Sequence, residues 1–152
     1  LSKVSFNYTF HIYGPISNMN YHKKCTDLIR ENKLNVEFKG SLDHSQIPTV
    51  LKDYHLFTLP TLGENFGHSI LEALAQSIPV LISDRTNWTF VNEKNAGKAI
   101  SLNSTSKWIE WLNAFSRHLS EEHAEFRNAA FLVAEESISS KSLLEDYIKL
   151  FS

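Results

Sequence analysis

Short apolar runs alternate with helical patterns along the first half of the chain. Four runs are rich in β-branched or aromatic residues and are bounded by Gly, Pro or Asn, as is typical of buried strands: residues 8–14, 35–40, 55–60 and 78–83. Helical patterns lie between them, at residues 21–32, 46–52 and 67–77. This order predicts an α/β fold with a Rossmann-like parallel sheet and right-handed crossovers.

The C-terminal third has a different pattern, which is helical. A fifth strand is expected at residues 98–102, and beyond it we predict helices at residues 106–118, 120–136 and 141–151, the second of them capped by Ser120. Earlier in the chain, Asp43 and Gln46 have the spacing of a capping box, which predicts that a helix begins there. One domain is expected, because 152 residues provide for a single sizeable core.

Composition and charge argue against several classes of partner. The formal net charge is −2 and the Lys and Arg residues are scattered, so no nucleic-acid partner is expected. No apolar run approaches the roughly 20 residues that span a bilayer, and the first residues lack the layout of a signal peptide, so we expect no transmembrane segment. The single cysteine, Cys25, fits a reducing, cytoplasmic setting.

Common catalytic and cofactor motifs are lacking in the sequence. There is no HExxH motif, and His118 and His123 are spaced to lie on different faces of a helix, so no metal site is expected. Without GxSxG or a recognisable partner, Cys25 is better interpreted as a core residue than as a nucleophile. Neither GxGxxG nor GxxxxGK[ST] is present, which argues against a standard dinucleotide or P-loop site.

Two glutamates occupy the otherwise apolar segment LPTLGENFGHSILEALAQSIPVLISD. Glu64 falls in a loop after a strand, where a helix N-terminus can bind an anion, and Glu72 falls within the following apolar helix, where a carboxylate needs a partner. Their spacing alone leaves two interpretations open. In the structural interpretation, Glu72 forms a salt bridge with a Lys or Arg or shares an exposed stripe with Gln76. In the functional interpretation, both carboxylates flank a ligand such as a sugar phosphate.

This segment resembles the donor site of retaining GT-B glycosyltransferases of the large group-1 (family four) type. The family's pattern of Glu-x-Phe-Gly, a second Glu-Ala and a later Pro-Val falls on Glu64, Phe66, Gly67, Glu72, Ala73, Pro79 and Val80. FHIYGP is similar to the family's second strand and glycine turn, VEFKGSL to the strand before its base-binding loop, and SDRTNW to its SDxTPW variant. The resemblance covers roughly residues 8–103.

The resemblance implies that residues 1–152 are the nucleotide-sugar-binding C-terminal domain of a two-domain enzyme. This is one half of a GT-B fold, and its first strand and helix and the N-terminal acceptor domain are expected to lie outside the chain. Glu72 is then expected to hold the ribose, and Glu64 to contact the transferred sugar as the catalytic residue. The remaining expected donor-binding residues are Asn65, Phe66 and Gly67 at the diphosphate, Gly40, Ser41 and Leu42 near the base, and Gly14 along the cleft.

The family's activity sets the expected function. The full-length protein is expected to transfer a sugar, with retention, from a UDP-, GDP- or ADP-sugar to a glycan or lipid acceptor in polysaccharide biosynthesis, without metal or cofactor. It is expected in the cytoplasm, with the N-terminal domain as a means of peripheral attachment to the inner membrane face.

Two departures from the family pattern bear on these expectations. The family's Arg and Lys at the diphosphate fall upstream of Leu1, so the chain alone is expected to bind donors weakly and to be inactive. Ser77 replaces a Gly that is usual at the end of the helix. The alternatives are an epimerase-like GT-B domain and a non-catalytic flavodoxin-like binding module.

Overall fold

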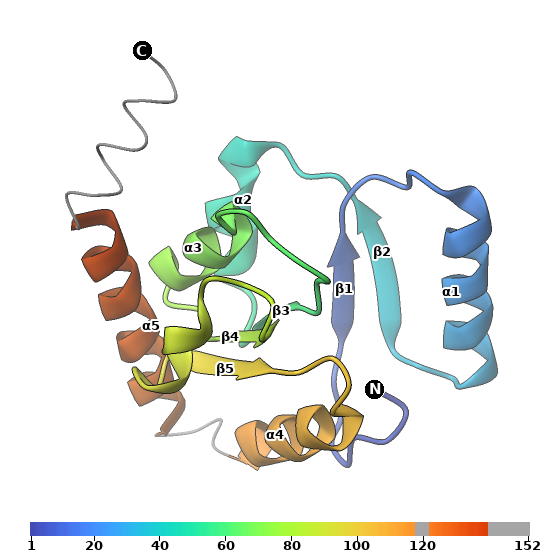
Figure 1. Cartoon of the computed structure of the whole chain (residues 1–152). Coiled ribbons are helices and arrows are strands. Elements are labelled where there is room, and N and C mark those ends of the chain that lie inside the picture. Colours follow the sequence, from blue (N-terminus) through green and yellow to red (C-terminus); the bar gives the residue numbers. More distant parts are fainter. Residues whose placement is uncertain (118–121, 140–152) are drawn as a thin grey trace.

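The computed structural model of the chain describes residues 1–117 and 122–139 (Figure 1). Its strands are β1 (Phe10–Tyr13), β2 (Val36–Gly40), β3 (Phe57–Leu59), β4 (Val80–Ser83) and β5 (Gly97–Ile100). Its helices are α1 (Met19–Glu31), α2 (Ile47–Leu51), α3 (His68–Ala75), α4 (Thr105–Arg117) and α5 (Glu122–Ser139), with 3-10 turns η1 (His44–Gln46) and η2 (Thr89–Asn92). The expected α/β order is confirmed, whereas Ser120 and the expected helix at 141–151 lie outside the described residues.

The strands are parallel, as expected, but they form two sheets instead of one. β1 pairs with β2, and β4 lies between β3 and β5 in a second sheet (Figure 1). In the six-stranded doubly wound order, one further strand lies between the strands that correspond to β1 and β3. The break therefore falls at the position of the strand that the resemblance places outside the chain.

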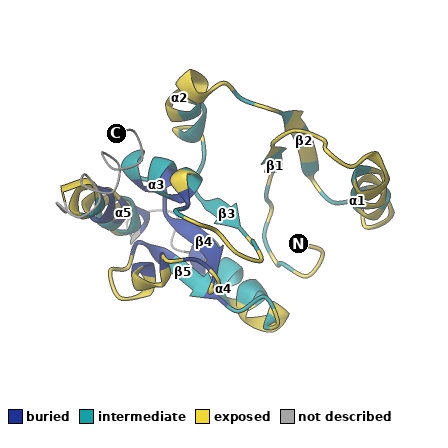
Figure 2. Cartoon of the chain, turned by 45° about the horizontal axis from the view of Figure 1, so that its top comes forward, coloured by how far each residue is buried: buried dark blue, intermediate teal, exposed yellow. Residues whose placement is uncertain are grey.

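The second sheet carries the hydrophobic core. All four residues of β4 are buried, which explains why this strand is a continuous apolar run instead of an alternating one. α3 packs against α5 and against β3 and β4, so the buried residues gather on this side of the molecule (Figure 2). The largest fully buried side chains include Ile70, Leu74, Ile78, Val80, Leu81 and Ile82.

The first sheet has much less cover. Among the described residues, none before Gly67 is buried, and α1 and β2 are largely exposed or half-buried (Figure 2). α1 contacts the sheet through His22, whose ring centroid lies 4.5 Å from that of Phe38. Cys25 is only half-buried on α1, so the expectation that it is a core residue is wrong. The reason is that nothing in the described structure covers the outer side of α1.

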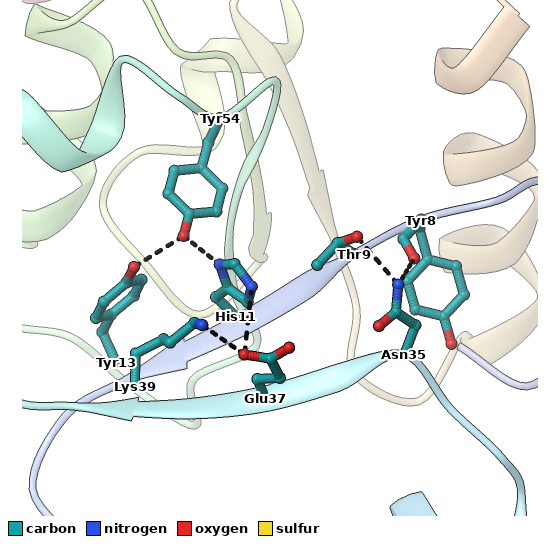
Figure 3. A network of polar contacts seen from close by, with 8 residues as sticks. All are labelled: Tyr8, Thr9, His11, Tyr13, Asn35, Glu37, Lys39 and Tyr54. Atoms are coloured by element: carbon teal, nitrogen blue, oxygen red, sulfur yellow. Dashed lines mark hydrogen bonds and ion pairs between the residues drawn. The ribbon is translucent and has the colours of Figure 1, made fainter.

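Tyr54, between α2 and β3, links the two sheets. Its hydroxyl hydrogen-bonds to Nδ1 of His11 and lies 2.8 Å from the hydroxyl of Tyr13, both on β1 (Figure 3). His11 also lies beside Glu37 of β2, which pairs with Lys39. Burial, followed by the hydrogen bond with Tyr13, raises the pKa of the Tyr54 phenol, so its proton is retained near neutral pH. A neutral hydroxyl can donate one hydrogen bond and accept another here.

Local signals explain where the elements that surround the site begin and end. The capping box is confirmed, with the Asp43 N–H donating to Oε1 of Gln46 over 3.0 Å. At the end of α3, Ser77 has a φ of 61°, and its N–H and that of Ile78 donate to the carbonyls of Leu74 and Ala73. Ser77 therefore occupies the left-handed position in which the family usually has Gly, and the Schellman turn forms around it.

Candidate functional site

The loop between β3 and α3 carries Glu64 at the carboxyl end of its strand. Glu64 is exposed, and within the described residues its carboxylate has no hydrogen bond or ion pair. Ligands of open parallel α/β sheets bind outside the carboxyl ends of the strands. The structure therefore places this carboxylate where a ligand can reach it.

The turn after β4 holds this loop from behind. The Ser83 hydroxyl donates to the carbonyl of Thr61 over 2.6 Å. The Asn87 amide donates to the carbonyl of Asn65 over 3.0 Å, and the Trp88 indole N–H donates to the carbonyl of Phe66 over 2.6 Å. Two successive carbonyls are thus fixed toward Asn87 and Trp88.

The orientation of the loop amides follows from these two bonds. In a planar trans peptide, the C=O and the N–H of one peptide group point in opposite directions. Because the carbonyls of Asn65 and Phe66 face Asn87 and Trp88, the N–H groups of Phe66 and Gly67 point away from that turn. The N–H groups of His68 and Ser69 follow directly and precede the helical bonding, which begins where the Ile70 and Leu71 N–H groups donate to the carbonyl of Gly67. Together these donors have the arrangement that favours an anion at the start of α3.

Gly67 is required for this geometry. It has a φ of +80°, and a Cβ placed on it would lie 2.9 Å from Nε1 of Trp88 and 3.0 Å from Cδ1 of Ile70. A side chain would therefore strain the backbone and push the loop away from Trp88. The glycine in the Glu64-x-Phe66-Gly67 pattern thus has a structural reason in this chain.

Glu72 lies on the solvent-facing side of α3, with 26% of its side chain exposed. Its Oε1 lies 3.0 Å from Nδ1 of His44, which belongs to η1. The partner of Glu72 is therefore a histidine. The structural interpretation in which Glu72 forms a salt bridge with a Lys or Arg is wrong. The apolar residues of α3 turn inward to the core, which leaves Glu72 on the remaining face.

The residues expected near the base lie beside this pair in the chain. The Gly14 N–H donates to the carbonyl of Gly40 over 2.9 Å, so the ends of β1 and β2 lie together. Ser41 and Leu42 follow, and His44 then brings the loop to Glu72. The structure therefore joins the expected base loop to the expected ribose carboxylate. It shows no direct contact between Glu64 and either of them within the described residues.

Sequence reasoning did not assign roles to three residues that the geometry makes important, His44, Asn87 and Trp88. The SDRTNW segment, which contains Asn87 and Trp88, carries only a family likeness in the sequence. A usable signal was Trp88, because a buried indole N–H needs an acceptor, and this side chain is 4% exposed. His44 gave no such signal, since its partner is distant in sequence.

No group of three or more His, Cys, Asp or Glu side chains in residues 1–117 and 122–139 is arranged to hold a metal ion. In the same ranges, none of the helices combines the length and the apolar character that crossing a membrane requires.

Comparison with solved structures supports the fold. A glycosyltransferase from Rickettsia africae superposes with a TM-score of 0.80 at 18% identity, covering 95% of this chain and 39% of that one. Anabaena Alr3699/HepE in complex with UDP and glucose gives a TM-score of 0.78 at 16% identity, with 97% and 42% covered. The pneumococcal O-GlcNAc transferase GtfA, solved with UDP and GlcNAc, gives 0.70 at 21% identity, with 93% and 28% covered.

Sequence comparison gives the family. A curated relative, the UDP-N-acetylglucosamine–peptide N-acetylglucosaminyltransferase GtfA subunit of Streptococcus agalactiae, is 26% identical over 120 residues, which are 78% of this chain. The chain spans only about a quarter of the length of such relatives, 23% in this case. Residues 3–130 match the family described as glycosyl transferases group 1. The chain therefore belongs to the group 1 glycosyltransferase family.

Proposed function

We propose that the chain is the nucleotide-sugar-binding part of a GT-B glycosyltransferase that transfers a sugar to a glycan or lipid acceptor. Family membership supports this function, as does the likeness of the fold to glycosyltransferases solved with UDP and a sugar. One observation carries the proposal: the Phe66 and Gly67 amides are aimed away from the supporting turn, beside the exposed carboxylate of Glu64.

In this proposal the diphosphate of the donor binds the amides of the β3–α3 loop. The N–H groups of Asn65, Phe66 and Gly67 and the positive end of α3 would stabilise the charge that develops on the departing diphosphate. This preorganised set of donors, in place of a divalent ion or a cofactor, would supply the electrostatic stabilisation. The hydrogen bonds from Asn87 and Trp88 fix the loop before the donor arrives, so little reorganisation is needed.

The two glutamates would bind different parts of the donor. Glu72 would accept hydrogen bonds from the ribose hydroxyls, with Gly40, Ser41 and Leu42 at the base. Glu64, which is exposed, would contact hydroxyls of the transferred sugar as the catalytic residue. A UDP-sugar is the first donor to test, because relatives were solved with UDP, and GDP- and ADP-sugars follow.

The remainder of the proposal concerns the whole protein. Residues 1–152 would form its C-terminal domain, with Gly14 along the cleft in which an N-terminal domain presents the acceptor. Transfer would proceed with retention, in a cytoplasmic enzyme of polysaccharide biosynthesis that attaches peripherally at the membrane through the other domain. This chain alone would bind donors weakly and would not catalyse transfer.

Steady-state kinetics of the full-length protein test this function. Replacing Glu72 by Gln removes charge-assisted hydrogen bonds worth about 1.5–3 kcal/mol, so the donor KM should rise roughly 10- to 150-fold. Glu64→Ala should lower kcat and leave the donor KM much less affected. Glu93→Gln is the matched control, since Glu93 is exposed beyond η2 and should change neither constant.

The outcomes separate the alternatives. Unchanged kinetics for both Glu64→Ala and Glu72→Gln would contradict the assignment of the site. A binding module would bind UDP without any transfer in the full-length protein, and an epimerase-like enzyme would convert the donor without an acceptor. NMR of the product would identify the anomer, and inversion would contradict the expected retention.

A further inference from the structure

A polar contact between His44 and Glu72 connects two segments that the proposed function assigns to one nucleoside. His44 is the first residue of η1, in the loop after β2, and Glu72 is in the middle of α3. The two atoms, Nδ1 and Oε1, lie 3.0 Å apart. Because an ionised carboxylate can only accept, the proton of this contact belongs to Nδ1 of His44.

The pair faces solvent, which makes a purely structural role insufficient to explain it. The His44 side chain is 87% exposed and that of Glu72 is 26% exposed. Exposed ion pairs contribute little to stability, because water screens the charges and the side chains lose entropy. The pair is thus better placed to act on something that arrives from solvent than to hold the fold together.

The backbone around His44 is fixed, although its ring is exposed. Asp43 and Gln46 form the capping box that starts η1, and the Asp43 N–H donates to Oε1 of Gln46 over 3.0 Å. The capping box therefore begins at the residue directly after Leu42, and η1 begins one residue later. The imidazole is consequently presented to Glu72 from a defined position.

The pair uses one carboxylate oxygen and leaves the other available. Oε1 of Glu72 binds His44, and within the described residues Oε2 has no hydrogen bond or ion pair. A carboxylate held at one oxygen has fewer rotamers open to it, so less entropy is lost when the second oxygen binds a ligand.

We propose that His44 is a positioning residue for the donor nucleoside: it holds Oε1 of Glu72 so that Oε2 is oriented for a ribose hydroxyl. This inference rests on the proposed function, because it takes Glu72 as the ribose ligand. His44 acts through Glu72 and through the loop that carries Gly40, Ser41 and Leu42, and it has no part in the chemical step. Its effect is therefore on ligands that contain a nucleoside.

Calorimetric binding of UDP and of inorganic pyrophosphate to the full-length protein tests the proposal. His44→Ala should weaken UDP binding about three- to tenfold, as expected for one lost orienting contact, and should leave pyrophosphate binding unchanged. With a donor sugar, KM should rise by the same factor while kcat stays constant. His44→Asn retains an N–H donor at the reach of Nδ1 and should restore most of the affinity for UDP.

Lys94→Ala provides the matched control. It removes an exposed ion pair, 2.8 Å long, between Lys94 and Glu136 of α5, and it should not alter UDP binding. A melting temperature close to that of the unmodified protein is expected for both alanine variants, because both pairs are exposed.

Comparing UDP binding by His44→Ala and by Glu72→Gln separates this proposal from the proposed function. If Glu72→Gln weakens UDP binding and His44→Ala leaves it within twofold, the role of His44 is wrong and the function stands. If Glu72→Gln has no effect on UDP binding, the proposed function itself fails. The double variant should bind UDP about as weakly as Glu72→Gln alone, and additive losses would show that His44 acts independently of Glu72.

Discussion

The two sheets of the molecule differ in how well they are covered, although both consist of short parallel strands. Every residue of β4 is buried between α3 and its neighbours, whereas β1 and β2 have only half-buried and exposed residues. The same contrast appears in Figure 2, where the dark blue residues gather on β4, α3 and α5. Strand pairing alone therefore does not give a region stability. Burial on both faces does, and among the described strands only β4 is buried at every residue, since the residues of β3 are half-buried.

This contrast has a functional counterpart. The β3–α3 loop and Glu72 are anchored on the well-packed sheet, while Gly14 and the Gly40–Leu42 loop belong to the poorly covered one. Tyr54 and the pair of His44 with Glu72 connect the two sides. We therefore expect the proposed diphosphate and sugar positions to be more rigid than the proposed base position in this chain.

The largest effect should come from Gly97, where β5 approaches β4. A Cβ at Gly97 would lie 2.0 Å from the carbonyl oxygen of Val80, and the residue has a φ of +148°. Gly97→Ala should therefore cost about 4 kcal/mol or more of unfolding free energy, measured by chemical denaturation. Gly63→Ala, with nothing within 4 Å of its Cβ, should change stability by about 1 kcal/mol at most. Equal losses for the two variants would contradict the packing described for the second sheet.

A smaller and matched comparison truncates one isoleucine on each sheet. Ile82 on β4 is 0% exposed, so Ile82→Ala should lose about 3 kcal/mol through lost burial and the resulting cavity. Ile12 on β1 is only half-buried, so Ile12→Ala should lose about 1 kcal/mol. Amide hydrogen exchange on the unmodified chain should agree, with β1 and β2 exchanging faster than β4. Similar protection of both sheets would show that the first sheet is better covered than its side chains indicate.

The smallest expected effect is on the pH dependence of stability, through the buried His123 of α5. Burial lowers the pKa of His123 from its ordinary value of 6.5, and the charges of His55 and Arg127 lower it slightly further. The hydrogen bond between its ring and the carbonyl of His55, 3.1 Å away, opposes this shift only in part. The unfolded chain then takes up the proton more readily, so the free energy of unfolding should fall as the pH drops through about 6.5 and below. His123→Gln should flatten this pH dependence, as followed by thermal unfolding between pH 5 and 8.

Much of the fold could be predicted from the sequence, because the signals are local. The runs around β1 to β5, the capping box at Asp43 and the apolar face of α3 each depend on residues close together in the chain. The division into two sheets is a matter of which strands pair, and the alternation of strands and helices does not determine it. The half-buried state of Cys25 depends on which elements pack against α1, and the residues around Cys25 in the chain do not determine that.

The sequence points to the residues of the candidate site but not to the contacts that they make. Glu64, Gly67 and Glu72 stood out through spacing and family likeness. The partner of Glu72 did not, because His44 lies 28 positions earlier and meets it only through the packing of η1 near α3. Likewise, the hydrogen bonds from Asn87 and Trp88 depend on β3 and β4 being neighbours.

An NMR titration of the chain with UDP, resolved at individual backbone amides, tests the central claim most directly. This measurement detects weak binding and reports on the groups that the proposal uses. At millimolar UDP the amides of Phe66, Gly67 and the start of α3 should shift, together with those of Gly40, Ser41 and Leu42, while α5 around Glu136 should not. Shifts confined to regions outside these segments, or no shifts at all, would contradict the assignment of this surface as the donor site.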